Sequence, residues 1–231
     1  YLGLPDELLQ IPDIRYAITS NGAVTTDLSS GQNLRVSLIS SAIVQEIAKI
    51  PRERDLIYNV FVDGAGYSEP HIYHRQLQRF IGTPIEDYVR KSRRSAEDMQ
   101  TLIASAVQGI ENIWIMCRDQ TERDQIHKTV EEHWNLTTVL TASTDIEIGA
   151  PGSDKGLALT ELAKALQIKK SDMLAIGDGE NDLGMLHAAG TAVAMGNASD
   201  KVKDQSDYIT DSNDRDGAAI AIEQFCLGGI A

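Results

Sequence analysis

The feature that most constrains this chain is a strand–turn–helix–strand segment in its C-terminal third. Met173–Ile176 is a short apolar strand, Asp182–Ala189 has the pattern of a helix, and Ala192–Met195 is a second apolar strand. Strands that alternate with helices predict a parallel sheet, because parallel neighbours need a crossover connection. The turn at residues 177–182 reads Gly-Asp-Gly-Glu-Asn-Asp. Acidic and amide side chains are therefore predicted at the carboxyl edge of this sheet, where α/β proteins bind ligands.

The middle of the chain has a different order of elements. Leu56–Val62 and Tyr67–Tyr73 flank an Asp-Gly-Ala-Gly turn and predict a β-hairpin. We therefore expect a separate α+β unit over residues 23–144, between the flanking segments 1–22 and 145–231. Further helices are predicted at residues 40–50 (ending at Pro51), 95–107, 119–134, 155–167 and 217–227, and further strands at 14–19, 112–117, 136–140, 145–148 and 208–210.

Composition excludes several classes of partner. The 231 residues carry a formal net charge of −13, which disfavours nucleic acid and anionic membranes, because both need a basic face. No apolar run reaches the ~20 residues of a membrane span, and no signal peptide opens the chain. Two cysteines, Cys117 and Cys226, do not make a disulfide framework, and we expect both to be unreactive core thiols. These observations favour a cytoplasmic protein; the oligomeric state is left open.

The acidic turn predicts a magnesium and phosphate site. Asp178 follows the strand and offers carboxylate oxygens to a hard cation. Asn181 and Asp182 open the next helix, where backbone amides and the helix dipole favour an anion. The alternative is a plain acidic turn in which Asp182 only caps the helix.

A lysine one helix earlier supports the same chemistry. Lys155 lies at the start of the helix predicted for residues 155–167, where its charge opposes the helix dipole. A phosphate nearby would offset that cost, although a surface lysine is the simpler alternative.

Three other places in the sequence are weaker candidates for functional residues. Asn21 follows the strand of residues 14–19 and could lie at the mouth of an active site, or in a plain turn. His71 and His74 have a spacing that suits a metal on a helix, but they lack acidic or cysteine partners nearby. Asp214 and Asp216 precede a helix and are expected to cap it.

Several of these strings resemble the haloacid dehalogenase superfamily. Residues 172–186 closely resemble its fourth motif, and the Pro-Gly-Ser-Asp-Lys-Gly string at residues 151–156 resembles its third. Residues 18–23, 192–198 and 212–217 are similar to the Cof-type branch of that superfamily. The resemblance implies a Rossmannoid parallel-sheet α/β core of residues 1–22 and 145–231, with an inserted α+β cap at residues 23–144.

The resemblance also implies a chemistry. It is Mg²⁺-dependent hydrolysis of small phosphorylated metabolites, such as sugar phosphates, through a phospho-aspartyl enzyme. Asp178 would be a Mg²⁺ ligand, and Asp182 would hold the water shell of the metal or orient Lys155. Lys155 and Asn181 would bind the transferring phosphoryl group. A sugar phosphomutase is an enzymatic alternative, and a non-catalytic remnant that binds Mg²⁺ or a partner is an alternative of another class.

The chain departs from that family at its start. The first motif is an Asp-x-Asp that carries the nucleophile, and no plausible match follows a strand here, since Asp214-Arg215-Asp216 is predicted in a loop near the C-terminus and is a poor candidate. The second motif, a Thr or Ser at the end of the next strand, is also not found. The resemblance makes residues 14–19 the third strand of the family sheet, whose order is three-two-one-four-five. We therefore expect the first two strands and the nucleophile either in a segment of the molecule before Tyr1 or supplied separately. These 231 residues alone are expected to be inactive and not to fold stably, since two sheet edges would lack partners.

Overall fold

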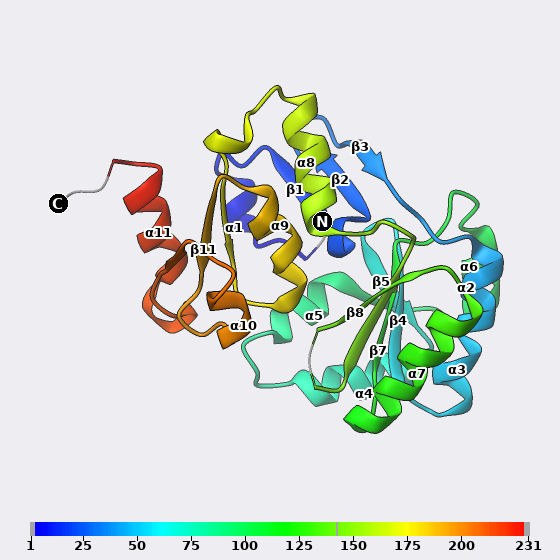
Figure 1. Ribbon diagram of the computed structural model, residues 1–231. Coiled ribbons are helices and arrows are strands. Elements are labelled where there is room, and N and C mark those ends of the chain that lie inside the picture. The colour runs from blue at the N-terminus through cyan, green and yellow to red at the C-terminus, as the bar shows by residue number, and fades with distance from the viewer. Residues whose placement is uncertain (1–2, 142, 229–231) are drawn as a thin grey trace. The chain divides into compact units, whose positions relative to one another are not determined.

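The computed structural model describes residues 3–141 and 143–228 and divides the chain into two compact units. Unit 1 is Tyr1–Ser153 and unit 2 is Asp154–Ala231. Figure 1 shows both units, with unit 2 in yellow-green to red. No helix in the described ranges is both long and apolar enough to span a bilayer.

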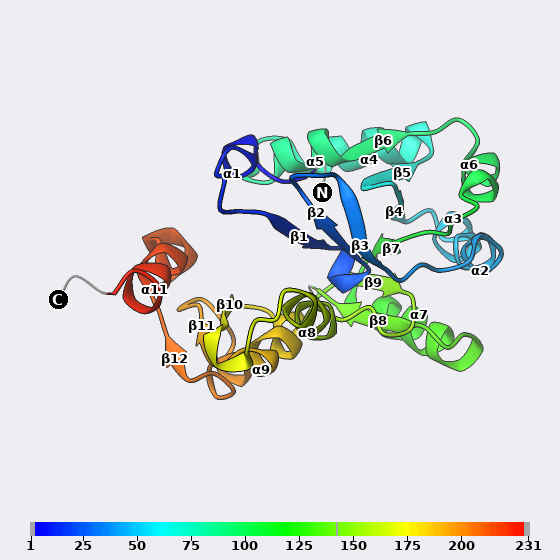
Figure 2. The ribbon, with the colours of Figure 1, turned by 90° about the horizontal axis from the view of Figure 1, so that it is seen from above.

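Unit 1 is built on a six-stranded mixed sheet with the order β6-β5-β4-β7-β9-β8. Only the β5–β6 pair is parallel among its described pairings. Its strands are β4 (Ile57–Val62), β5 (Ala65–Ser68), β6 (Arg93–Ser95), β7 (Asn112–Met116), β8 (Thr137–Leu140) and β9 (Asp145–Gly149). Its helices are α2 (Ser41–Ile47), α3 (Lys49–Glu53), α4 (Pro70–Phe80), α5 (Glu86–Ser92), α6 (Met99–Ser105) and α7 (Gln120–His133). Helices α4 and α5 lie side by side next to β5 and β6 (Figure 2).

The two faces of this sheet differ in chemistry. Side chains alternate along a strand, and the register pairs Tyr58 with Ile115 and Val60 with Ile113, so these four share one face. All four are completely buried and belong to the main core of unit 1. The opposite face carries polar residues, including Asn59, Asn112 and Glu147. A polar sheet face is thus available for a site.

A second, antiparallel sheet precedes the first in sequence. It contains β1 (Tyr16–Thr19), β2 (Val24–Asp27) and β3 (Gln32–Val36), after the short helix α1 (Asp6–Leu9). Strand β1 was predicted, but β2 and β3 were not. The turn η1 (Ser20–Gly22) joins β1 to β2 with φ angles of 51°, 51° and 91°.

Unit 2 confirms the predicted parallel sheet. Strands β10 (Leu174–Gly177), β11 (Thr191–Ala194) and β12 (Tyr208–Ile209) run parallel in that order. Its α-helices are α8 (Lys155–Ala165), α9 (Leu183–Ala188), α10 (Asp200–Lys203) and α11 (Gly217–Phe225), and its 3₁₀ turns are η2 (Lys170–Asp172), η3 (Glu180–Asp182) and η4 (Asn213–Arg215). Its core is formed mostly by alanines together with Leu186 and Val202.

The chain divides into its two units between Ser153 and Asp154, after strand β9, which pairs with β7 and β8. The grouping of residues 1–22 with 145–231 in one core stays a prediction.

Four local predictions were wrong. Pro51 lies inside α3, because a proline is tolerated in the first turn of a helix. The second hairpin strand ends at Ser68, and Pro70 begins α4 at its first position. Asp216 precedes α11 but makes no capping hydrogen bond with its side chain. Cys117 is buried as expected, but Cys226 is exposed, because it follows the last turn of α11.

Candidate functional site

The acidic turn after β10 is held in shape by one carboxylate. Asp182 is 6% exposed, and its Oδ2 accepts hydrogen bonds from the backbone N–H groups of Asp178 and Gly179, both at 3.0 Å. A Cβ on Gly177 would lie 2.6 Å from the Cβ of Asp182, closer than real Cβ contacts come. Only glycine at position 177 therefore lets the chain close this turn around Asp182.

Helices α8 and α9 approach each other closely at their first turns (Figure 1). A Cβ on Gly156 would collide with the backbone carbonyl of Gly184, so glycine at position 156 permits the contact. Asp154 caps α8 by accepting the N–H of Leu157 at 2.8 Å. The close packing brings Lys155, the first residue of α8, beside the acidic turn.

Lys155 and Asp182 form an ion pair. Lys155 Nζ lies 2.5 Å from Asp182 Oδ1. The side chain of Lys155 is 28% exposed and that of Asp182 is 8% exposed. Lys155 is therefore accessible to a ligand, whereas Asp182 is almost fully enclosed.

The protonation state of Asp182 follows from these contacts. Burial by itself would raise the pKa of Asp182, but the hydrogen bonds from Lys155 and from the amides of Gly179 and Asp178 favour the charged form. Burial and these hydrogen bonds together hold the pKa of Asp182 below its ordinary value, so Asp182 is a carboxylate at neutral pH. An anionic Asp182 holds the ammonium group of Lys155 in place beside the turn.

Asp178 is exposed, and its carboxylate is oriented by a residue that sequence reasoning missed. Asn197 Nδ2 donates to Asp178 Oδ2 at 2.9 Å, and Asn197 Oδ1 accepts the backbone N–H of Asn213 at 2.9 Å. A signal existed, because the Gly-Asn pair at residues 196–197 ends the strand next to β10. Neighbouring parallel strands end at the same sheet edge, so Asn197 could have been placed near Asp178.

Asn181 lies in η3 and is half-buried. A Cβ on Gly179 would clash with Asn181 Oδ1, so the amide of Asn181 lies against the glycine backbone. The turn thus brings Asp178, Asn181 and Asp182 together with Lys155, and the roles predicted for these four residues stay predictions.

The donor set fits Mg²⁺ only in part. Within residues 3–141 and 143–228, no group of three or more His, Cys, Asp or Glu side chains could hold a metal ion. Mg²⁺, however, is often bound through one or two carboxylates together with waters and substrate phosphate. Asp178, an exposed and oriented carboxylate, fits as one such ligand. His71 and His74 are both exposed on α4 and belong to no such metal-binding group.

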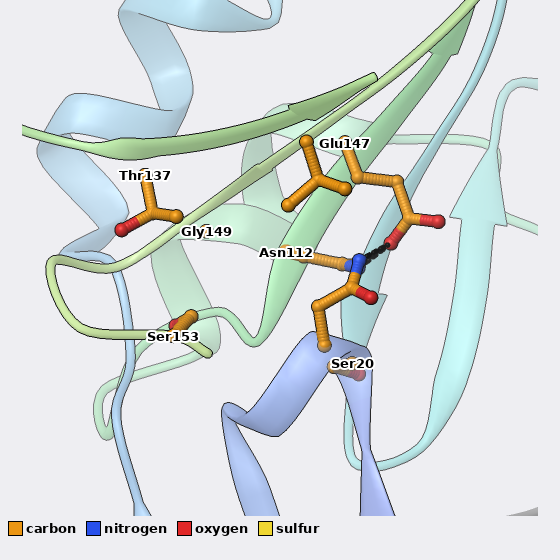
Figure 3. Close-up of a pocket in the computed structure, with 8 residues that line it drawn as sticks. Ser20, Asn112, Thr137, Glu147, Gly149 and Ser153 are labelled. Atoms are coloured by element: carbon orange, nitrogen blue, oxygen red, sulfur yellow. Dashed lines mark hydrogen bonds between the residues drawn. The ribbon is translucent and has the colours of Figure 1, made fainter. Parts of the chain in front are cut away.

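In unit 1, Asn21 lies at a polar cluster on the six-stranded sheet. Asn21 Nδ2 and Asn112 Nδ2 each donate to Glu147 Oε2 at 2.8 Å, and Ser20 Oγ donates to Glu111 Oε2 at 2.7 Å. Figure 3 shows the small cavity beside them, which we call the Asn112 cavity. Its volume is about 10 Å³, and it is lined by Ser20, Asn21, Asn112, Thr137, Val139, Glu147, Gly149 and Ser153. The place of Asn21 at an active-site mouth stays a prediction.

Comparisons with known proteins test the family. A family model described as haloacid dehalogenase-like hydrolase matches residues 6–222. Over 132 residues, the chain is 39% identical to the 5-amino-6-(5-phospho-D-ribitylamino)uracil phosphatase YwtE of Bacillus subtilis. Over 102 residues, it is 34% identical to the phosphoglycolate phosphatase of Methanoculleus marisnigri. These matches cover 56% and 44% of this chain but only 46% and 44% of the relatives, so the chain spans about half the length of the curated relatives it matches.

Solved structures agree on the fold. A haloacid dehalogenase-like hydrolase from Bacteroides thetaiotaomicron has a TM-score of 0.76 at 23% identity, over 96% of this chain and 84% of that one. Another, from B. subtilis, has a TM-score of 0.75 at 27% identity, over 92% and 79%. Both confirm the predicted α/β fold class. Since the family model covers most of the sequence, this chain belongs to the haloacid dehalogenase-like hydrolase family.

Proposed function

We propose that this chain is part of a Mg²⁺-dependent phosphatase that hydrolyses small phosphorylated metabolites. The observation that carries the proposal is the Lys155–Asp182 ion pair beside Asp178 at the carboxyl end of β10. Phosphoryl transfer needs positioning and charge neutralisation more than covalent help from the protein, and these side chains supply both.

Each residue has a proposed role. Lys155 and Asn181 bind the transferring phosphoryl group, and Lys155 neutralises charge on its oxygens. Asp182 holds Lys155 in place. Asp178 is one ligand of the metal. When bound, Mg²⁺ supplies Lewis-acid stabilisation of the phosphoryl oxygens.

The nucleophile is proposed from the family resemblance. The first aspartate of an Asp-x-Asp motif that follows a strand would attack phosphorus as the ester P–O bond breaks. The second aspartate would protonate the leaving alcohol. Water would then hydrolyse the acyl phosphate and release inorganic phosphate. The Asp-x-Asp string of these 231 residues, Asp214-Arg215-Asp216, lies at η4 and is a poor candidate for this role.

The substrate class follows from charge and from relatives. A net charge of −13 disfavours large polyanions, so the phosphate must be attracted locally. The relatives include phosphatases of a phosphorylated ribitylaminouracil and of phosphoglycolate, and a structural neighbour is described as a sugar phosphatase. We therefore propose small monophosphates, sugar phosphates among them. Residues 23–144 would serve as the cap that selects the substrate, in a cytoplasmic setting.

Phosphate release from a panel of sugar and polyol monophosphates tests the proposal. The intact protein should release phosphate with Mg²⁺, and Lys155→Met should reduce kcat by at least about 100-fold, as for loss of a group that stabilises transition-state charge. Lys164→Met is the matched control, because Lys164 is exposed on the same helix. An equal fall in kcat in both variants, or no turnover of any monophosphate, would contradict the proposal. Either result would favour a non-catalytic remnant that binds Mg²⁺ or a partner.

A further inference from the structure

Asn197 joins two segments that approach each other at the end of β11. Its amide nitrogen donates to Asp178 Oδ2 at 2.9 Å, and its amide oxygen accepts the N–H of Asn213 at 2.9 Å. Both polar atoms of the side chain are therefore used, one on the predicted metal ligand and one on the backbone of η4.

The backbone on either side of Asn197 is held in place. The Gly196 N–H donates to the carbonyl of Asp211 at 2.9 Å. A Cβ on Gly196 would lie 2.8 Å from the backbone nitrogen of Ser212, so only glycine permits this approach. The backbone that carries Asn197 is thus fixed against residues 210–212.

We propose that Asn197 is a positioning residue for the metal ligand Asp178, an inference that rests on the proposed function. By holding one carboxylate oxygen, Asn197 sets the direction in which Asp178 presents itself to a cation. Partners that orient a ligating carboxylate typically contribute 10- to 100-fold, roughly, to metal affinity. Asn197 itself touches neither metal nor substrate in this role.

Mg²⁺ affinity of the intact protein tests this inference without turnover, measured by competition against Mn²⁺ in electron paramagnetic resonance. Asn197→Ala and the similarly shaped Asn197→Leu should each weaken Mg²⁺ binding roughly 10- to 100-fold. Asn213→Ala is the matched control, because Asn197 uses only the backbone N–H of Asn213. The control should bind Mg²⁺ like the wild type. Thermal unfolding of each variant checks that the fold is kept.

The outcomes separate this inference from the proposed function. If Asp178→Asn abolishes Mg²⁺ binding while both Asn197 variants bind like the wild type, Asn197 has no positioning role and only this inference fails. If the wild type binds no Mg²⁺, or binds it equally well with Asp178→Asn, the proposed metal role fails and this inference falls with it.

An independent observation in unit 1 concerns the Asn112 cavity. Asn112 and Ser153 line this cavity, and neither Asn112 Oδ1 nor Ser153 Oγ has a hydrogen-bond partner. Their residues are only 4% and 3% exposed. Leaving a buried polar atom unsatisfied costs roughly 1–3 kcal/mol, so two such atoms at one cavity need an explanation.

We infer that one water molecule binds in the Asn112 cavity and bridges Asn112 Oδ1 to Ser153 Oγ. The cavity volume of about 10 Å³ matches the space that a single water needs. A water supplies two donors and can satisfy both atoms. Glu147 Oε2 already accepts hydrogen bonds from two side-chain amides, so no cation in the cavity is needed to balance this carboxylate. The water would fix Ser153, two residues before Lys155 in sequence.

Two variants decide whether that water is present. With the water bound, Ser153→Ala removes a satisfied hydroxyl and should raise the unfolding equilibrium constant about fivefold. Thr25→Val is the control, because Thr25 Oγ1 is also buried and without a partner but does not line the cavity. Removal of the Thr25 hydroxyl should leave the unfolding equilibrium constant unchanged or lower it. If Ser153→Ala behaves like Thr25→Val, or if a high-resolution crystal structure shows no water in the cavity, the inference is wrong.

Discussion

Lys155 Nζ lies 2.5 Å from Asp182 Oδ1, and the other oxygen of Asp182 accepts two backbone N–H groups of the turn after β10. One carboxylate therefore ties the first residue of α8 to the turn that carries Asp178. A change at either end of this pair should affect both the stability of unit 2 and the placement of its candidate catalytic groups.

Removing the positive charge of Lys155 should destabilise the protein. Lys155→Met leaves Asp182 enclosed without its partner, and we expect a loss of about 2 kcal/mol at pH 7, below the range for fully buried pairs because Lys155 is partly exposed. Chemical denaturation measures the loss, with Lys164→Met as control. A loss equal to that of the control would show that the pair contributes no stability.

Acid should remove the contribution of ionised Asp182 to the unfolding free energy. Its pKa is lowered in the folded state from an ordinary value of 3.8, so the stabilisation is fully present above that value. It is lost as the pH falls below 3.8 through the folded pKa. Asp182→Asn should therefore show a weaker decline in unfolding free energy over this acid range than the wild type. Parallel curves for the two proteins would contradict the lowered pKa.

The close packing of α8 and α9 predicts that a larger residue at position 156 destabilises the protein. Gly156→Ala should destabilise by roughly 1–3 kcal/mol through the clash with the Gly184 carbonyl, although alanine ordinarily favours a helix. Thermal unfolding measures the change. Stabilisation by this substitution would mean that the two helices do not approach so closely.

The two thiols should react at different rates. Burial raises the pKa of Cys117 to about 11, so its reactive thiolate is scarce at neutral pH, whereas Cys226 is exposed. A disulfide reagent should modify one thiol quickly in the native protein, and Cys226→Ser should remove that phase. A fast phase that persists in Cys226→Ser would contradict the burial of Cys117.

Sequence reasoning succeeded where local pattern and chemistry coincide. The parallel sheet of unit 2 was predictable, because β10 and β11 are short apolar strands separated by a helix. The approach of Lys155 to Asp182 could be expected only through the family resemblance, since it depends on Gly156 and Gly184, whose packing no local pattern reveals. Strand β3 was missed because it is largely exposed, which leaves no alternation of apolar residues to read. Strand β2 is mostly buried, but its Val-Thr-Thr-Asp sequence has only one apolar residue and shows no alternation either. Asn197 was overlooked because its contact with Asp178 crosses between neighbouring strands.

The central claim is that Asp178 and Lys155 belong to one Mg²⁺-dependent phosphatase site. Its most direct test is phosphate release by the intact protein from a sugar monophosphate, titrated with Mg²⁺, for the wild type and for Asp178→Asn. The account predicts turnover that saturates with Mg²⁺ in the wild type and falls by at least about 100-fold in Asp178→Asn. Turnover that survives both removal of Mg²⁺ by a chelator and the Asp178→Asn substitution would contradict it.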